Sequence, residues 1–240
     1  MIPLLLWSMR MRVLLVAVLC WLFYLYEPGF HQHGEVAGPL TDPLLLPTGI
    51  AFTLANLAAA SMLVLLAGFI AADRRRGYYR LFFAHPTRPE AYYGLRWGLA
   101  YLISLLAAAA FLLLGQLAAW GELRVSPAVL LQAALFALVY GGVLAFLSAL
   151  LPRGDALVAV ALFFLTDFWH LLTGELGAEP LTPLLRQVVS FVLPPHLAVS
   201  DVYLGLVAGS VPVDAALFAA GYGVFWLAAA ALLLRLREWP

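Results

Sequence analysis

The stretch PAVLLQAALFALVYGGVLAFLSALL, residues 127–151, carries no charged side chain and points most clearly to the fold. A helix needs about 20 apolar residues to cross the hydrocarbon core of a bilayer, and this stretch is long enough. It does not alternate between apolar and polar positions, as the strands of a membrane barrel do. The stretch therefore predicts a transmembrane helix.

The rest of the chain has the same character. Of its 240 residues, 65% are hydrophobic and only 11% are charged, and the mean hydropathy is +0.97. A soluble domain of this length would need more polar residues to cover its surface. We therefore predict an all-α polytopic membrane protein, with residues 1–240 forming a single transmembrane domain in the lipid bilayer.

Hydropathy predicts six spans joined by short or irregular connectors. An apolar segment with two arginines, residues 1–12, precedes the first span and is expected to lie as a helix along the membrane interface. No small-residue cleavage site follows the first span, so we expect it to be retained. The outer connector over residues 173–212 holds apolar pieces too short to cross, which predicts an outer re-entrant stretch. The predicted spans are residues 13–26, 48–72, 94–119, 127–151, 156–172 and 213–234.

Arginine sets the predicted orientation, because all 13 basic residues are arginine. With a cytoplasmic N-terminus, only Arg124 and Arg186 fall outside. Basic residues collect in the cytoplasmic loops of membrane proteins. We therefore expect a multi-pass protein of the cell (inner or plasma) membrane with both termini in the cytoplasm.

The span over residues 156–172 contains an unusual group of polar side chains, Thr166, Asp167 and His170. Asp167 and His170 share one helical face about a turn apart. An ionisable residue within a membrane suggests a functional site. With Asn56 of the second span, these residues are candidates for a transport pathway or a subunit interface. A local structural pair near the outer headgroups is the alternative.

Other polar and small residues within the spans are expected to serve helix packing. The polar ones are expected to form hydrogen bonds between helices, and the glycines to let two helices approach closely. These residues are Gln116, Gln132, Ser148, Gly141, Gly142 and the GYG motif at 221–223.

Several catalytic and binding motifs are missing from the sequence. A phosphate-binding loop needs a lysine, and the chain has none. Zinc-protease, serine-elbow and paired-acid motifs are also missing, so we expect no catalytic residue, no metal and no cofactor in this chain, and no nucleic-acid partner. His31 and His33 in HQH are expected to be solvated, and a metal site among the four outer histidines, His31, His33, His170 and His196, is the alternative. An intramembrane enzyme that uses Asp167 and His170, together with His196, is a further alternative.

The connector DRRRGYYRLFFAHPTRPEAYYGLR, residues 73–96, concentrates arginine and aromatic side chains between the second and third spans. Tyr79, Phe82 and Phe83 fall on one helical face. Pro86 then breaks any helix. Such a surface can rest on the membrane interface or dock on a cytoplasmic partner.

This connector resembles the cytoplasmic loop that follows the second span of ABC transporter type-2 permeases. The shared pattern is an acidic residue, an arginine, two further positions and a glycine. A proline and a nearby arginine then follow. The predicted topology is also similar, and LPPHLAVSDVYLGLVAGSVP resembles the segment before the last span of several members. The connector departs from the family at Tyr78, where threonine is common. The matching residues are Asp73, Arg74, Gly77, Pro86, Arg88 and Arg96.

The resemblance implies the membrane-spanning subunit of an ATP-driven exporter, with the connector as a coupling helix seated in a groove of a separate ATPase subunit. It also implies a pathway built by two copies, or by one copy and a homologue, with the first and fifth spans between subunits. ATP and magnesium would bind to the ATPase partner. A membrane scaffold without transport remains an alternative, since the same connector would serve it. The implied coupling residues are Gly77, Tyr78, Tyr79, Phe82, Phe83, Pro86 and Arg88.

Overall fold

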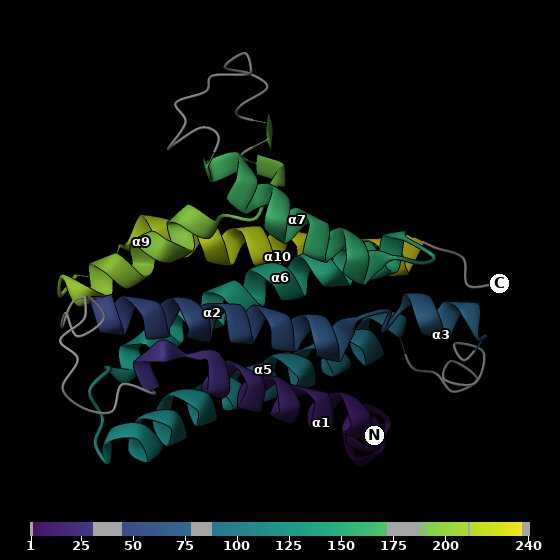
Figure 1. Cartoon of the computed structure of the whole chain (residues 1–240). Coiled ribbons are helices and arrows are strands. Elements are labelled where there is room, and N and C mark those ends of the chain that lie inside the picture. Colours follow the sequence, from purple (N-terminus) through teal and green to yellow (C-terminus); the bar gives the residue numbers. More distant parts are fainter. Residues whose placement is uncertain are drawn as a thin grey trace.

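The computed structural model describes residues 2–30, 45–77, 88–171, 188–189, 191–210 and 212–236. Every regular element in those ranges is a helix, which confirms the all-α prediction (Figure 1). The α-helices are α1 (Ile2–Tyr26), α2 (Leu45–Leu66), α3 (Ala71–Arg75), α5 (Pro89–Trp120), α6 (Leu130–Leu150), α7 (Asp155–His170), α9 (His196–Val207) and α10 (Val213–Leu236). Short 3-10 helices, η1 (Pro28–Phe30) and η3 (Pro127–Val129), lie beside α1 and α6.

Five of the helical segments in the described residues are long and apolar enough to cross a membrane. They correspond to five of the predicted spans, so the chain is a helical membrane-embedded protein. α7 has 16 residues, about 24 Å at the rise of an α-helix, which is less than the hydrocarbon thickness of about 30 Å. The fifth predicted span, over residues 156–172, therefore stays a prediction. The five segments are Leu5–Tyr26, Thr48–Arg75, Pro89–Trp120, Pro127–Leu150 and Val213–Leu236.

The first helix differs from the prediction. α1 is continuous, so residues 2–12 do not form a helix separate from the first span, and their position at the membrane interface stays a prediction. Pro3 lies in the first turn, where proline is tolerated, and no glycine or further proline interrupts the helix. Met9 is fully buried, which shows that the N-terminal half of α1 packs against the bundle.

α6, the helix formed by the uncharged stretch, is the centre of the bundle and contacts α2, α5, α7, α9 and α10. Its closest approach is to α10. A side chain on Gly142 would collide with the backbone of Gly223, and one on Gly223 would meet the Leu138 carbonyl oxygen at 2.8 Å. Small residues at this crossing confirm the predicted packing role of Gly142 and Gly223, whereas Gly221 faces open space.

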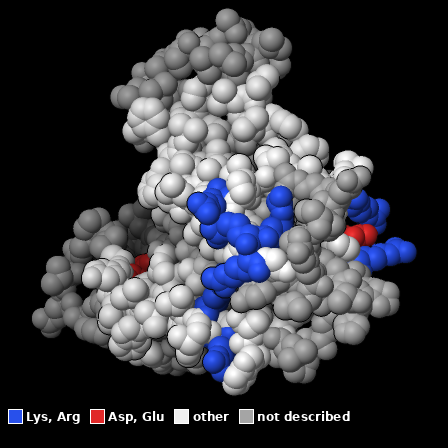
Figure 2. Space-filling view, turned by 90° about the vertical axis from the view of Figure 1, so that its right-hand side faces the viewer, with Lys and Arg blue, Asp and Glu red and all other residues white. Residues whose placement is uncertain are grey.

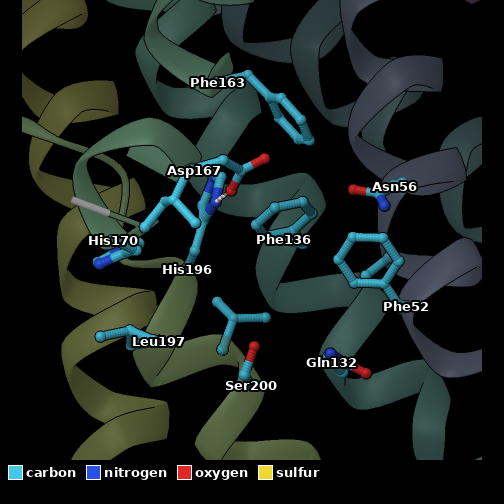
Figure 3. A pocket seen from close by; sticks show the side chains of 13 residues that line it. Phe52, Asn56, Gln132, Phe136, Phe163, Asp167, His170, His196, Leu197 and Ser200 are labelled. Carbon is cyan, nitrogen blue, oxygen red and sulfur yellow. Dashed lines mark hydrogen bonds and ion pairs between the residues drawn. The ribbon is translucent and has the colours of Figure 1, made fainter. Parts of the chain in front are cut away.

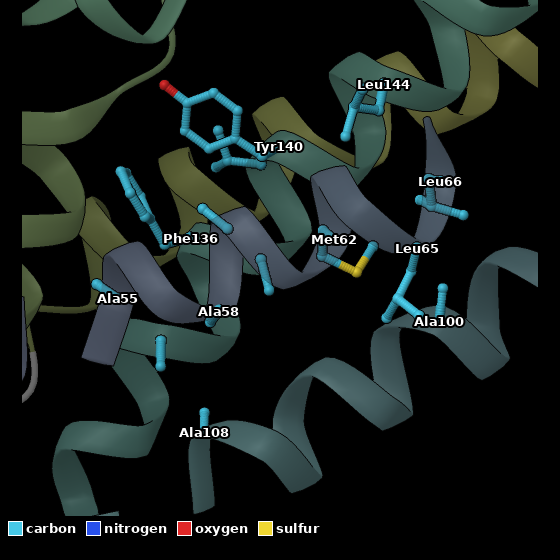
Figure 4. Packing of buried hydrophobic residues seen from close by; sticks show 14 of the residues in the cluster. Ala55, Ala58, Met62, Leu65, Leu66, Ala100, Ala108, Phe136, Tyr140 and Leu144 are labelled. Atoms are coloured by element: carbon cyan, nitrogen blue, oxygen red, sulfur yellow. The ribbon is translucent and has the colours of Figure 1, made fainter. Parts of the chain in front are cut away.

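α2 packs between α6 and α5 through small residues. Ala58 on α2 and Ala100 on α5 are fully buried among larger side chains such as Met62 (Figure 4). Ser104 of α5 donates a hydrogen bond to the Ala58 carbonyl oxygen at 2.8 Å. These contacts place α2 where it can supply side chains to a site shared with α6.

Arginine side chains gather at one end of the bundle. This end carries the first residues of α1, the segment α3, the connection between α6 and α7 and the last turn of α10 (Figures 1 and 2). The asymmetry agrees with the positive-inside pattern, although which side faces the cytoplasm stays a prediction. Exposed arginines at this end are Arg10, Arg75, Arg76, Arg153 and Arg235.

Candidate functional site

The second span bends at a turn over residues 67–70, between α2 and α3. Gly68 has a φ of 67°, in the left-handed region that glycine adopts most readily. A break of this kind releases backbone N–H and C=O groups that must find other partners in an apolar environment.

Side chains from three other helices supply those partners. Asp155 of α7 accepts a hydrogen bond from the Gly68 N–H at 2.8 Å. Ser148 Oγ of α6 accepts from two backbone amides at the end of the turn, each at 3.2 Å. Arg12 of α1 donates to two carbonyls at the end of α2, at 2.6 and 2.8 Å. The bend is therefore tied to α1, α6 and α7, and Ser148 acts as a cap for a broken helix.

An ion pair joins the two ends of the connector, Asp73 and Arg96, which together form its base. Arg96 Nη1 of α5 lies 3.0 Å from Asp73 Oδ2 of α3, and the two side chains are only 9% and 13% exposed. The same nitrogen donates to the Phe69 carbonyl oxygen at 3.3 Å. Because the pair is nearly buried, it holds the first turns of α5 against α3 and the bent turn.

Only two of the predicted coupling residues lie in the described ranges. Gly77 follows α3 with a φ of 70°, and Arg88 immediately precedes α5. The others lie outside the described residues: Tyr78, Tyr79, Phe82, Phe83 and Pro86.

Three of the polar residues predicted within the spans, Asn56, Asp167 and His170, meet in the other half of the bundle, away from the end where the arginines gather. They line a cavity of about 580 Å³ between α2, α6, α7 and α9 (Figure 3). Asp167, His170 and Asn56 all face this cavity. Thr166 does not line it, because it is buried and donates to the Leu162 carbonyl oxygen of its own helix at 2.7 Å.

A chain of hydrogen bonds forms one wall of the cavity. His196 Nδ1 lies 2.7 Å from Asp167 Oδ1, and His196 Nε2 lies 2.6 Å from the Tyr140 hydroxyl. A carboxylate can only accept, so Nδ1 carries the hydrogen and Nε2 accepts from Tyr140. This tautomer satisfies the imidazole and joins α6, α7 and α9.

His196 begins α9, which lies outside the five candidate spans. Burial lowers the pKa of His196, because the charged ring would lose its hydration, and the neighbouring Asp167 opposes this effect. The lowered pKa favours the neutral ring, in agreement with an Nε2 that accepts from Tyr140.

Two buried polar atoms that belong to residues lining the cavity have no hydrogen-bond partner. They are Gln132 Oε1 and His170 Nε2. The Asp167 side chain is 50% exposed. The described residues contain no group of three or more His, Cys, Asp or Glu side chains suited to a metal ion, and His31 and His33 lie outside them.

An apolar groove of about 310 Å³ adjoins the cavity. It runs between α1, α2, α6 and α7, and it shares Asn56 and Phe163 with the cavity. Leu19 and Phe23 of α1 form its far wall.

Sequence reasoning found Asp167 and His170, and it named His196 only for the enzyme alternative, not as the hydrogen-bond partner of Asp167. It missed Tyr140, which lies in another helix and bonds to His196. Gln132 was expected to bond to a neighbouring helix, and its side-chain oxygen is instead unpaired. Gln116 also differs, since its oxygen accepts from the backbone of the loop after α5, at 2.6 Å from Val125 N.

No family model, curated protein or solved structure matches this chain.

Proposed function

We propose that this chain is the membrane-spanning permease subunit of an ATP-driven ABC exporter, coupled to separate ATPase subunits. The observation that carries the proposal is the anchored base of the connector. The buried pair of Asp73 and Arg96 lies directly beside the bend of the second span. A docking loop transmits force only if its base is held to the helices that must move.

The hydrogen bonds at the bend offer a route for that force. Asp155 and Ser148 tie the bent turn to α7 and α6, and both helices also line the cavity in the other half of the bundle. Displacement of the connector would tilt α2 relative to these helices. Such rigid-body movements of packed helices are a common form of switching.

The exporter would work as a dimer of this chain or as a pair with a homologue. α1 and α7 carry large apolar side chains on their outer faces, among them Trp21, Phe164 and Phe168. Such faces suit lipid or a second subunit. ATP and magnesium would bind to the partner ATPase.

The cavity favours a transporter over the two alternative functions, a membrane scaffold and an intramembrane enzyme. A scaffold requires no polar cavity between its helices. An intramembrane enzyme requires an activated nucleophile. Ser200 lines the cavity, but His196 Nε2 is already bonded to Tyr140.

Co-purification tests the proposal. The tagged full-length chain, isolated from its native membrane, is expected to carry an ATP-binding-cassette subunit. The double change Phe82→Asp and Phe83→Asp should abolish this capture, because it places charge on the apolar docking face. Leu123→Asp is the matched control, since Leu123 is exposed in the loop after α5, far from the connector. Capture that survives the double change would overturn the docking role.

A further inference from the structure

We propose that the cavity and the adjoining groove bind an amphiphilic organic cation, with its charged headgroup beside Asp167 and its apolar tail along α1. As a statement about transported substrate, this rests on the proposed function. The binding site itself rests only on the geometry of the described residues.

The charges of the cavity wall favour a cation. Among the described residues that line it, Asp167 is the only carboxylate and no arginine is present. One carboxylate oxygen accepts from His196, while the side chain remains half exposed. An intramembrane carboxylate normally pairs with an opposite charge, and on the described wall Asp167 pairs only with His196, whose lowered pKa favours the neutral ring.

Gln132 provides a second and independent observation. Gln132 lines the cavity (Figure 3), its side chain is 5% exposed, and its Oε1 is buried without a hydrogen-bond partner. An unpaired buried acceptor costs free energy unless a ligand donates to it. An ammonium group donates hydrogen bonds to carboxylate and amide oxygens alike.

Aromatic rings complete the surroundings of the headgroup. Phe52, Phe136 and Phe163 all line the cavity (Figure 3). The faces of aromatic rings attract cations and repel anions. The wall therefore combines a half-exposed carboxylate with aromatic rings, a combination that favours a positive headgroup.

The adjoining groove would hold the apolar tail of the amphiphile. Its walls are apolar side chains apart from Asn56 and Tyr140, and it begins where Asn56 and Phe163 also border the cavity. Lipid tails are as apolar as such a groove, so a tail gains little by leaving the bilayer. The charge of the headgroup must therefore decide which amphiphile binds.

Three probes with the same tail test this inference: dodecylammonium, dodecanol and dodecyl sulfate. Their binding is measured to the full-length chain in nanodiscs of zwitterionic lipid. We expect dodecylammonium to bind about tenfold or more tightly than dodecanol, which corresponds to about 1.4 kcal/mol. Dodecyl sulfate should bind more weakly than dodecanol. Equal binding of the cation and the anion would overturn the inference.

Two cavity variants and one control variant test whether the preference for the cation arises in the cavity. Asp167→Asn should reduce the affinity for dodecylammonium to that for dodecanol, and Asp201→Asn, an exposed change on α9 outside the cavity wall, should leave it intact. Gln132→Leu breaks no hydrogen bond to Oε1, so it should fold normally and weaken dodecylammonium binding about threefold to tenfold. A cation preference that survives both cavity variants would contradict the site.

The two proposals fail separately. A cation preference in a chain that captures no ATPase subunit would overturn the exporter and support the site. ATPase capture without a cation preference would overturn the site and leave the exporter supported.

Discussion

The bend over residues 67–70 and the cavity in the other half of the bundle differ in how their polar groups are paired. At the arginine end, the backbone groups released by the bend over residues 67–70 are met by Asp155, Ser148 and Arg12. In the cavity at the other end, Gln132 Oε1 and His170 Nε2 are buried and unpaired. Paired groups stabilise a fold, whereas unpaired groups cost stability and suit a ligand. The comparison predicts that substitutions will lower stability at the first end and binding at the second.

The largest loss of stability is expected for Arg96→Met. Removing one partner of a buried ion pair takes away the arginine that directly pairs with Asp73, and such a change costs about 3–5 kcal/mol. Thermal unfolding of the purified chain in detergent measures the loss. Arg235→Met is the control, because Arg235 is exposed in its pair with Glu90 and such pairs contribute about 0–1 kcal/mol. Equal shifts for the two variants would contradict the anchored base.

A smaller loss is expected for Ser148→Ala. This change keeps the helix and removes the acceptor for two buried amides of the bent turn, which costs about 1–3 kcal/mol. Unfolding in detergent again provides the measurement. Ser126→Ala, at the exposed start of η3, removes a single cap bond and should cost less. A change at Ser148 without effect would show that the bend is held by other contacts.

The cavity should behave differently under the same test. Gln132→Leu replaces an unpaired buried amide with an apolar group, so the free energy of unfolding should stay unchanged or rise. Dodecylammonium binding by the same sample should fall. A clear loss of stability would mean that Gln132 is a structural residue, and the contrast between the two ends would disappear.

The smallest effect is expected from pH. Burial lowers the pKa of His196, so the unfolded chain binds its proton more readily than the folded chain. Stability contributed by the neutral ring is therefore present above the ordinary histidine pKa of about 6.5 and is lost as the pH falls below it. Melting curves between pH 7.5 and 5 measure this loss, and His196→Gln should reduce it. An identical pH profile in the variant would assign the effect to other groups.

Sequence alone predicted most of the long helices because a continuous run of apolar residues is a local signal for a membrane-spanning helix. The uncharged stretch over residues 127–151 predicted α6, and Gly142 and Gly223 were predicted to be close-packing points, although the sequence did not show that they pack against each other. The bend at Gly68 was not foreseen, since a single glycine in an apolar run does not reveal which side chains will cap it. A continuous α1 was missed because its arginines suggested an interface, while Arg12 instead bonds to the end of α2.

The candidate site was only half predictable. Asp167 and His170 stood out because ionisable residues are rare within spans. Tyr140 and Gln132 look like ordinary packing residues until the fold brings α6 beside α7 and α9. Long-range pairs such as Asp73 with Arg96 depend on how helices cross, which local periodicity does not specify.

Photo-crosslinking from the connector tests the central claim most directly. A photoreactive residue in place of Phe82, activated in native membranes, is expected to form a covalent product with an ATP-binding-cassette subunit. The same residue in place of Leu123 should form none. Products with lipid alone from position 82, or the same ATPase product from both positions, would contradict an exporter driven through this connector.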